Sequence, residues 1–411
     1  MDERRYYGLD ALRGIMMMLG IVLHSAVFYL VLPPPLMSPM VDRGSTSYVC
    51  DAVVNLIHSF RMPTFFILSG FFTALLVEKR GTWGTYRNRA ARILAPLLVG
   101  AVTILPLTLL FLIDYLVALR FGTHELLPDR AQVHQLGQEM ARAGLPVGEP
   151  GLAHLWFLYY LCWFYLLIPV CRWLSRASER VTPALRSLLD SPVSLVVLGA
   201  YTAATLWPFQ GAQVYDNFVL LRPHPPSLLY YGSFFVFGFV LHAHRQSLAS
   251  YVRFLPWSIP LAAVLFPLSL YCTALLNSGT DSATAIHVAA VLAHGLCTWA
   301  LAYVAIGLVL RFFDHESPWT LYISQSSYWV FLVHMPAACF AAWLLAGHDL
   351  PGFAKFTSVV AFTTVVSFVT YHHLVQRTWV SRFLNGKRFD LDWPWRKAPA
   401  VPPGEASTPI R

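Results

Sequence analysis

The chain carries little charge for its length. Asp, Glu, Lys and Arg make up 12% of its 411 residues, and 56% of the residues are hydrophobic. Soluble globular domains typically carry about 25% charged residues. We therefore do not expect a water-soluble fold, and a disordered chain is excluded because disordered segments are poor in hydrophobic residues.

Cysteine and the common cofactor motifs are also scarce or missing. The chain has six cysteines, five of them inside or at the ends of apolar stretches, so a disulfide framework is excluded. The sequence has no P-loop, no dinucleotide fingerprint and no Cys/His spacing suited to zinc, and its serines lack a nucleophile-elbow context. It therefore predicts no metal site.

Long apolar stretches are what the chain does have. About ten of them reach roughly 20 residues or more, which is enough for a helix to cross a hydrocarbon core of about 30 Å. Strands of a membrane β-barrel would instead alternate between apolar and polar residues over about 10 residues. We therefore predict an all-α fold, a polytopic integral membrane bundle of about ten transmembrane helices. The predicted spans are 9–32, 50–77, 92–119, 152–174, 192–208, 227–245, 252–276, 284–311, 320–346 and 353–381.

Basic residues are distributed unevenly between the two sides of these spans. Of the 29 Lys and Arg residues, two fall within spans, six lie on one side and 21 on the other. Because cytoplasmic loops are enriched in Lys and Arg, both termini are predicted to be cytoplasmic, and the first span to be a retained anchor. The 21 residues lie at the N-terminus, in 79–92 and 172–186, at Arg245, Arg253 and Arg311, and from Arg377 onward.

The chain divides into a membrane domain and a tail. Residues 1–381 are expected to form one transmembrane domain, and residues 382–411, which are polar and rich in proline, a disordered cytoplasmic tail. The longest external connection, 120–151, either covers an external site or is a plain loop. We find no internal repeat, which argues against the two related halves of many transporters.

Ionisable residues within the spans are candidate functional residues, because a charge at the bilayer centre costs about 2.5–3.5 kcal/mol. In the first span Arg13 and His24 share one helix face, about 16 Å apart along the axis. Asp10 lies one turn before Arg13 and is placed to orient its guanidinium. The alternative is that Arg13 reaches lipid headgroups and His24 bonds a neighbouring helix.

The second span carries His58 and Arg61 one turn apart, with Arg61 near the midplane. Because arginine keeps its proton, Arg61 needs an anion, a cluster of carbonyls or water. An anionic group of a bound donor would supply such a partner, and Arg61 is predicted to bind it. The alternative is structural: Pro63 breaks the helix ladder just beyond, and Arg61 would bond the freed carbonyls.

Two further histidines complete the set of candidates. His334 lies near the midplane beside Pro336, and His154 lies at the outer mouth beside Trp156, a residue type common at membrane interfaces. Midplane histidines facing a cationic entrance favour proton abstraction and the handling of an anionic ligand. Two classes fit: group transfer across the membrane from a phosphate-bearing cytosolic donor, or proton-coupled transport through a His relay.

Four sequence blocks, in order and at suitable depths, resemble the membrane-bound acyltransferase-3 family. The first contains Arg13 and His24 in the spacing of the family's Arg-x10-His signature. The resemblance covers about residues 6–385, lacks the extra periplasmic domain of some members, and is closest to members that succinylate osmoregulated periplasmic glucans. The blocks are 9–14 with His24, 58–63 with 65–70, 154–158 and 328–334.

The resemblance implies a mechanism. Acyl-CoA enters from the cytoplasm, with succinyl-CoA favoured and acetyl-CoA as the alternative, and its phosphates lie near Arg13 and the segment 79–92. His24 is the general base, since an imidazole with an unperturbed pKa of about 6.5 accepts a hydroxyl proton at neutral pH. The acceptor hydroxyl of a periplasmic glucan approaches past His154. Direct transfer and an acyl-enzyme intermediate both stay open.

The predicted protein is therefore an acyl-CoA-dependent acyltransferase of the bacterial cytoplasmic (inner) membrane. Its partners are cytosolic acyl-CoA, a periplasmic glycan and membrane lipids, without nucleic acid. Two alternatives stay open: an O-acetyltransferase of lipopolysaccharide or another exported polysaccharide, and a proton-coupled glycan or lipid exporter that needs no acyl-CoA. The predicted site comprises catalytic His24 and Arg13; donor-binding Arg61, His58, Asp10, Arg89 and Arg92; and His154, Trp156 and His334 on the acceptor side or in support.

Overall fold

All regular secondary structure in the described part of the chain is helical. Eight helical segments there are long and apolar enough to cross a membrane, and ten if each of two bent helix pairs counts as one span. The predicted all-α polytopic membrane bundle is thus confirmed. The computed structural model describes residues 6–142, 151–209, 211–214, 221, 223–278, 283–389 and 393–394.

The spans are built from long helices and two bent helix pairs. The bent pairs are α6 (Trp156–Leu166) with α7 (Ile168–Arg180), at 60°, and α8 (Thr182–Leu189) with α9 (Val193–Leu206), at 90°. The other long helices are α1 (Tyr7–Ala26), α2 (Tyr48–Arg89), α4 (Ile104–Phe121), α10 (Pro225–Ala243), α12 (Leu255–Asn277), α13 (Ala283–Phe312), α14 (Pro318–Leu345) and α15 (Gly352–Thr370). Shorter helices are α3 (Ala95–Val102), α5 (Arg130–Arg142), α11 (Leu248–Arg253) and α16 (Trp379–Asn385).

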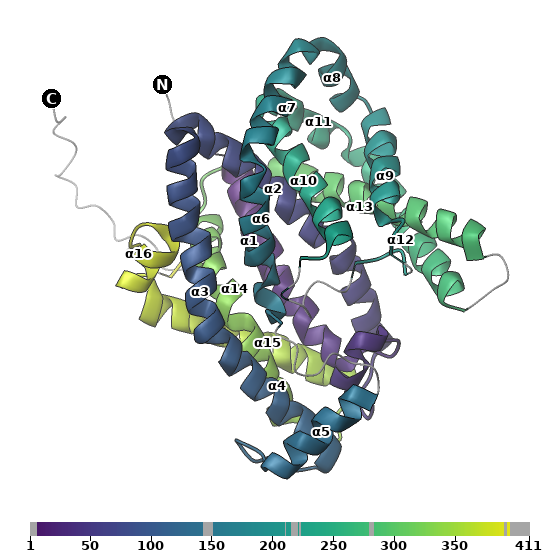
Figure 1. Ribbon diagram of the computed structural model, residues 1–411, viewed down its shortest axis with the longest axis vertical. Helices are drawn as coiled ribbons and strands as arrows, with labels where there is room; N and C mark the ends of the chain where they lie inside the picture. The colour runs from purple at the N-terminus through teal and green to yellow at the C-terminus, as the bar shows by residue number, and fades with distance from the viewer. Residues whose placement is uncertain are drawn as a thin grey trace.

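Helix α2 extends well beyond the predicted second span, which ends at residue 77. It continues to Arg89 and passes Pro63 with helical backbone angles. Gly81, with φ of 68°, is the one residue inside it with non-helical angles, and a side chain there would be strained. A π-helical turn (Ala90–Leu94) then leads into α3, and α3 and α4 lie end to end along one side of the molecule (Figure 1).

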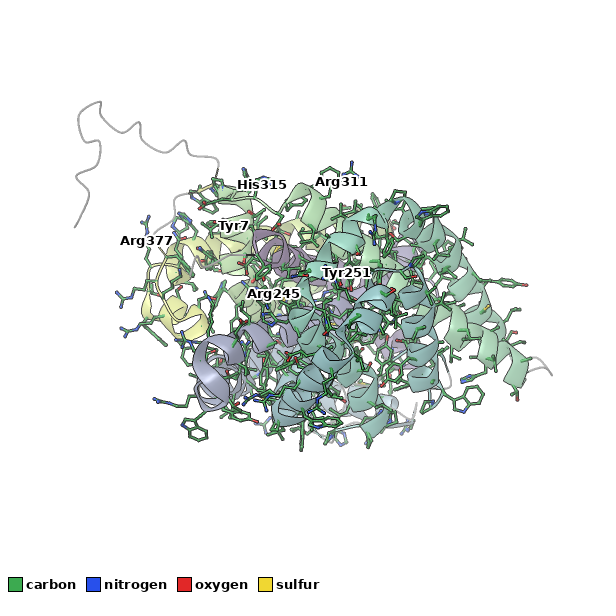
Figure 2. The ribbon with its side chains drawn as sticks, turned by 90° about the horizontal axis from the view of Figure 1, so that it is seen from above. Tyr7, Arg245, Tyr251, Arg311, His315 and Arg377 are labelled. Carbon is green, nitrogen blue, oxygen red and sulfur yellow. The ribbon has the colours of Figure 1, made fainter. Side chains whose placement is uncertain are left out.

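The helix ends fall into two groups. We define the basic end as the end where α1 begins and where α2, α10, α13 and α15 finish; Figure 2 labels Arg245, Arg311 and Arg377 among its residues. The start of α1 is fixed there because the Gly8 N–H donates to Asp314 Oδ1, at 2.9 Å. By the positive-inside rule this end faces the cytoplasm, and that orientation stays a prediction.

The connection between α1 and α2 is held at the opposite end by buried polar contacts. Lys355, 1% exposed, donates to Asp42 Oδ2 at 2.7 Å. Asp51 accepts from the N–H groups of Val31 and Leu32, at 2.9 Å each. These contacts fix the connection over the bundle.

At the basic end, α16 packs against the π-helical turn that precedes α3. Arg92 Nη1 donates to the carbonyls of Arg382 and Phe383, and the Phe389 N–H donates to Gln376 O at 2.9 Å. The first residues of the predicted tail, 382–411, therefore belong to an ordered helix and the turn after it. Residues 395–411 of that tail lie outside the described residues.

Helices α2 and α10 cross through glycines. A Cβ at Gly70 would collide with the Phe235 carbonyl oxygen, and one at Gly238 would collide with the Ile67 carbonyl oxygen. Small residues at such crossings let two membrane helices approach closely and gain van der Waals contact. This crossing positions α2, which carries three of the predicted site residues, His58, Arg61 and Arg89.

Gly70→Ala is expected to lower the thermal stability of the purified protein, because the added methyl group pushes α10 away from α2. Overpacking of this kind typically costs about 1–3 kcal/mol. Gly211→Ala is the matched control, since a Cβ there meets nothing within 4 Å. Thermal unfolding in detergent measures both variants, and equal stability of the two would contradict the close crossing.

Candidate active site

Two cavities lie one beyond the other in the bundle. The larger, about 670 Å³, is at the basic end and is lined by five cationic side chains. The smaller, about 70 Å³, contains most of the predicted polar residues. The cationic residues of the larger cavity are Arg13, Arg80, Arg89, Arg92 and Lys387. We call these the basic cavity and the histidine cavity.

The histidine cavity brings together side chains from four helices. It collects six of the ten predicted site residues, although they are spread over more than 300 positions of the sequence. They are His24 from α1, His58 and Arg61 from α2, His154 from the 3₁₀ turn (Ala153–Leu155) that leads into α6, Trp156 from the start of α6, and His334 from α14.

Arg61 is the buried cation of this cavity, with 6% of its surface exposed. Its Nε donates to the carbonyl oxygen of Met16 on α1, at 2.7 Å. Arg61 Nε thus bonds a carbonyl of α1. In the predicted structural alternative it would bond a carbonyl of α2 that Pro63 leaves free. The guanidinium reaches α1 because Gly20 has no side chain: a Cβ there would collide with Arg61 Nη2.

His334 and His154 are held in defined orientations by backbone carbonyls. His334 Nδ1 lies 2.7 Å from Phe331 O and 3.1 Å from Val330 O, and His154 Nε2 lies 3.1 Å from Leu332 O. Because a carbonyl only accepts, these nitrogens carry the proton in the neutral rings. The other nitrogens, His334 Nε2 and His154 Nδ1, are buried acceptors without a partner among the described residues.

His24 completes a row of three rings. The ring centroids of His24 and His334 are 5.2 Å apart, and those of His334 and His154 are also 5.2 Å apart. Neither ring nitrogen of His24 makes a hydrogen bond within the described part of the chain, so both are available to a ligand. His58 instead uses Nε2 to donate to the Val214 carbonyl at 3.1 Å.

Arg13 lies in the basic cavity, apart from His24. Its Nη2 donates to Ser324 Oγ at 2.8 Å and lies 3.3 Å from Asp10 Oδ1, so Asp10 contacts the guanidinium as the helix spacing predicts. The two residues predicted on one face of α1 therefore line different cavities, and Met17 between them lines both.

Arg89 and Arg92 also line the basic cavity, but they differ in how far their guanidinium groups are already engaged in hydrogen bonds. Arg89 Nη2 lies 3.3 Å from Thr73 Oγ1, a long contact with a neutral group. Arg92 Nη1 caps the carbonyls of Arg382 and Phe383 in α16. Arg92 thus supports the cavity wall, and Arg89 is the freer cation.

Sequence reasoning missed several lining residues. Tyr231, Met37 and Val214 line the histidine cavity, and Lys387 lines the basic cavity from the segment predicted as tail. None of these carries a local signal, since each reaches its cavity only through helix packing. No described residue of the 120–151 connection lines either cavity. Among the described residues, no cluster of three or more His, Cys, Asp or Glu could hold a metal.

Comparison with known proteins identifies the class. Residues 6–372 match the acyltransferase-3 family, described as an acyltransferase domain. The chain therefore belongs to this family and is a membrane acyltransferase, a multi-pass protein of the bacterial inner membrane. No solved structure matches it.

The chain is similar to glucans biosynthesis protein C of Salmonella. The proteins of that name from Salmonella paratyphi B and Salmonella typhi are each 24% identical to it over 378 residues, which cover 89% of this chain and 91% of the relative. The predicted resemblance to the family is confirmed, and so is the similarity to members named glucans biosynthesis protein C.

Gly20→Ala is expected to lower acyl transfer while the protein stays folded, because the new methyl group displaces the Arg61 guanidinium. Misplacing an active-site group by about 1 Å can cost about 10²-fold in rate. Gly44→Ala is the control, since its Cβ would meet only Asp42 Oδ1, at an ordinary 3.5 Å. Transfer rates of the two purified variants test this; unchanged transfer by Gly20→Ala would contradict a role for Arg61.

Proposed function

We propose that this protein transfers a succinyl group from cytosolic succinyl-CoA to a hydroxyl of a periplasmic glucan, with His24 as general base. The observation that carries the proposal is the stacking of a cation-lined basic cavity on a buried histidine cavity. Such a pair suits a phosphate-bearing donor at one end and proton transfer at the other. The names of the similar Salmonella proteins support a glucan acceptor.

The basic cavity suits the CoA moiety. Arg13, Arg80, Arg89 and Lys387 face it from three separate segments, and arginine forks bind phosphate oxygens by paired hydrogen bonds. Its volume of about 670 Å³ lies in the usual range for ligand and cofactor sites, about 300–1,000 Å³. By the predicted orientation, this cavity opens toward the cytosolic pool of the donor.

The histidine cavity suits the chemical step. His24 takes the proton of the acceptor hydroxyl as that oxygen bonds to the thioester carbonyl carbon. The C–S bond then breaks, and the CoA sulfur leaves with the proton that His24 returns. The free acceptor nitrogens of His154 and His334 are placed to receive further hydroxyl protons of the glycan in hydrogen bonds.

Direct transfer fits this cavity better than an acyl-enzyme. The described residues that line it include no Ser, Thr or Cys, the usual nucleophiles of acyl-enzymes. In the proposed mechanism both substrates therefore react in one step, with His24 acting as a base and not as a nucleophile. Two alternatives are distinguished by the experiment that follows. One is O-acetylation of lipopolysaccharide or another exported polysaccharide, and the other is export without acyl-CoA.

The test is thermal stabilisation of the purified protein by CoA esters, combined with mass spectrometry of periplasmic glucans from cells with and without the gene. A ligand that binds only the native state raises apparent stability, so succinyl-CoA is expected to raise the unfolding temperature. Loss of succinyl groups from the glucans is expected without the gene. No stabilisation by any CoA ester would favour an exporter, and loss of acetyl groups from another glycan would favour that acceptor.

His24→Ala is expected to abolish acyl transfer and to leave stabilisation by CoA unchanged, because His24 lies in the histidine cavity and CoA is held in the other. Removing a general base typically costs about 10²–10⁴-fold in rate. His294→Ala is the control: His294 is also buried, on α13, and lines neither cavity. Wild-type turnover by His24→Ala would end the proposal.

Arg61→Gln is expected to reduce succinyl transfer far more than acetyl transfer, because only succinate brings a second carboxylate into the histidine cavity. Arg89→Gln, in the basic cavity, is expected to lower the use of both donors alike. Competition between succinyl-CoA and acetyl-CoA measures the ratio of succinyl to acetyl transfer directly. An equal loss of both donors in Arg61→Gln would show that Arg61 does not select the donor, and that it acts on both alike through its bond to the Met16 carbonyl or through general donor binding.

A further inference from the structure

Four apolar side chains lie where the two cavities meet. Met17, Phe65, Phe157 and Phe331 are the residues that line both of them. They come from α1, α2, α6 and α14, one from each helix. All four are buried, with at most 7% of their surface exposed. We call them the apolar ring.

The apolar ring lies one layer toward the basic end from the polar residues. On α2 and α6 it follows the polar residue, as Phe65 follows Arg61 by four positions and Phe157 follows His154 by three. These helices run toward the basic end.

On the two helices that run the other way, the order is reversed. Phe331 precedes His334 by three positions on α14, and Met17 precedes His24 by seven on α1, and both helices begin at the basic end. At 1.5 Å per residue the offsets are about 4.5–10 Å. The four helices therefore build two stacked layers, apolar toward the basic cavity and polar beyond it.

The aromatic members brace one another. The ring centroids of Phe65 and Phe157 are 4.7 Å apart and those of Phe157 and Phe331 are 5.9 Å apart, both in edge-to-face geometry. Met17 is the flexible member, because an unbranched thioether with three rotatable bonds adapts its shape easily. A passage between the cavities would therefore open most readily by movement of Met17.

We infer that the apolar ring is the acyl-selecting gate of this enzyme. The inference rests on the proposed function, in which the donor is held in the basic cavity and reacts at His24. The phosphates stay with the cations of the basic cavity, so only the thioester end crosses the ring. The histidine cavity beyond it, about 70 Å³, has room for a small acyl group. This small volume, bounded on one side by the four apolar side chains, excludes long acyl chains.

Transfer from a series of CoA esters of increasing chain length tests the gate. In Met17→Ala the ratio of hexanoyl to succinyl transfer is expected to rise at least about tenfold, since apolar pockets discriminate about 10–200-fold per methylene. Met18→Ala is the control: Met18 is the next methionine along α1, is half-buried, and lines neither cavity. The same ratio in both variants would overturn the inference.

A second pair of variants repeats the test on α2. Phe65→Leu widens the apolar ring, whereas Phe66→Leu changes a neighbouring buried ring that lines neither cavity. The hexanoyl ratio is expected to rise only in Phe65→Leu, and an equal rise in both variants would count against the gate. Thermal unfolding of each variant confirms that the comparison is between folded proteins.

A labelling experiment tests the barrier without any acyl donor. Leu23→Cys places a thiol in the histidine cavity, and a small membrane-impermeant thiol reagent is added on the side of the basic end, with the chain lacking this substitution as background. Labelling is expected to be faster when Met17→Ala is added and unchanged with Met18→Ala. Equal labelling would overturn the barrier. If the wild type transfers no acyl group from any CoA ester, the proposed function fails, and this labelling still decides the barrier.

Discussion

The hydrogen bond from Arg61 to the Met16 carbonyl is the contact on which the rest of the site depends. A guanidinium keeps its charge inside a membrane, so it persists there only with a fixed polar partner. That partner lies on α1, and Gly20 leaves the space for it. The bond therefore locks α1 against α2 at the depth of the histidine cavity, and with it the position of His24 relative to the other polar residues.

Around this contact the protein is layered along the direction of its spans. Cations come first, at the basic end, followed by the apolar ring, the polar layer and a cover that includes Met37. In the proposed mechanism the phosphates of the donor remain among the cations, and only the acyl group passes the apolar ring to reach His24. The buried pair of Lys355 and Asp42 holds the connection that carries Met37.

Much of this was predictable from the sequence, because the membrane imposes strong patterns. Apolar length predicted the spans, and the cost of intramembrane charge singled out His24, Arg61 and His334, which the structure brings together. The apolar ring was not predicted, because phenylalanine and methionine are ordinary core residues. Its pattern, an apolar residue about one or two turns from a polar one, becomes visible only when the four helices are compared in the structure. The Met16–Arg61 bond was not predicted either. Its acceptor is a backbone carbonyl, which every residue type carries.

In the proposed mechanism, donor and acceptor reach His24 from opposite faces of the membrane. Reconstitution in vesicles of known orientation tests it, with succinyl-CoA confined to one side and the glucan acceptor to the other. We expect transfer only when succinyl-CoA is on the side of the basic end and the glucan is on the opposite side. Equal transfer with both substrates on one side would contradict it.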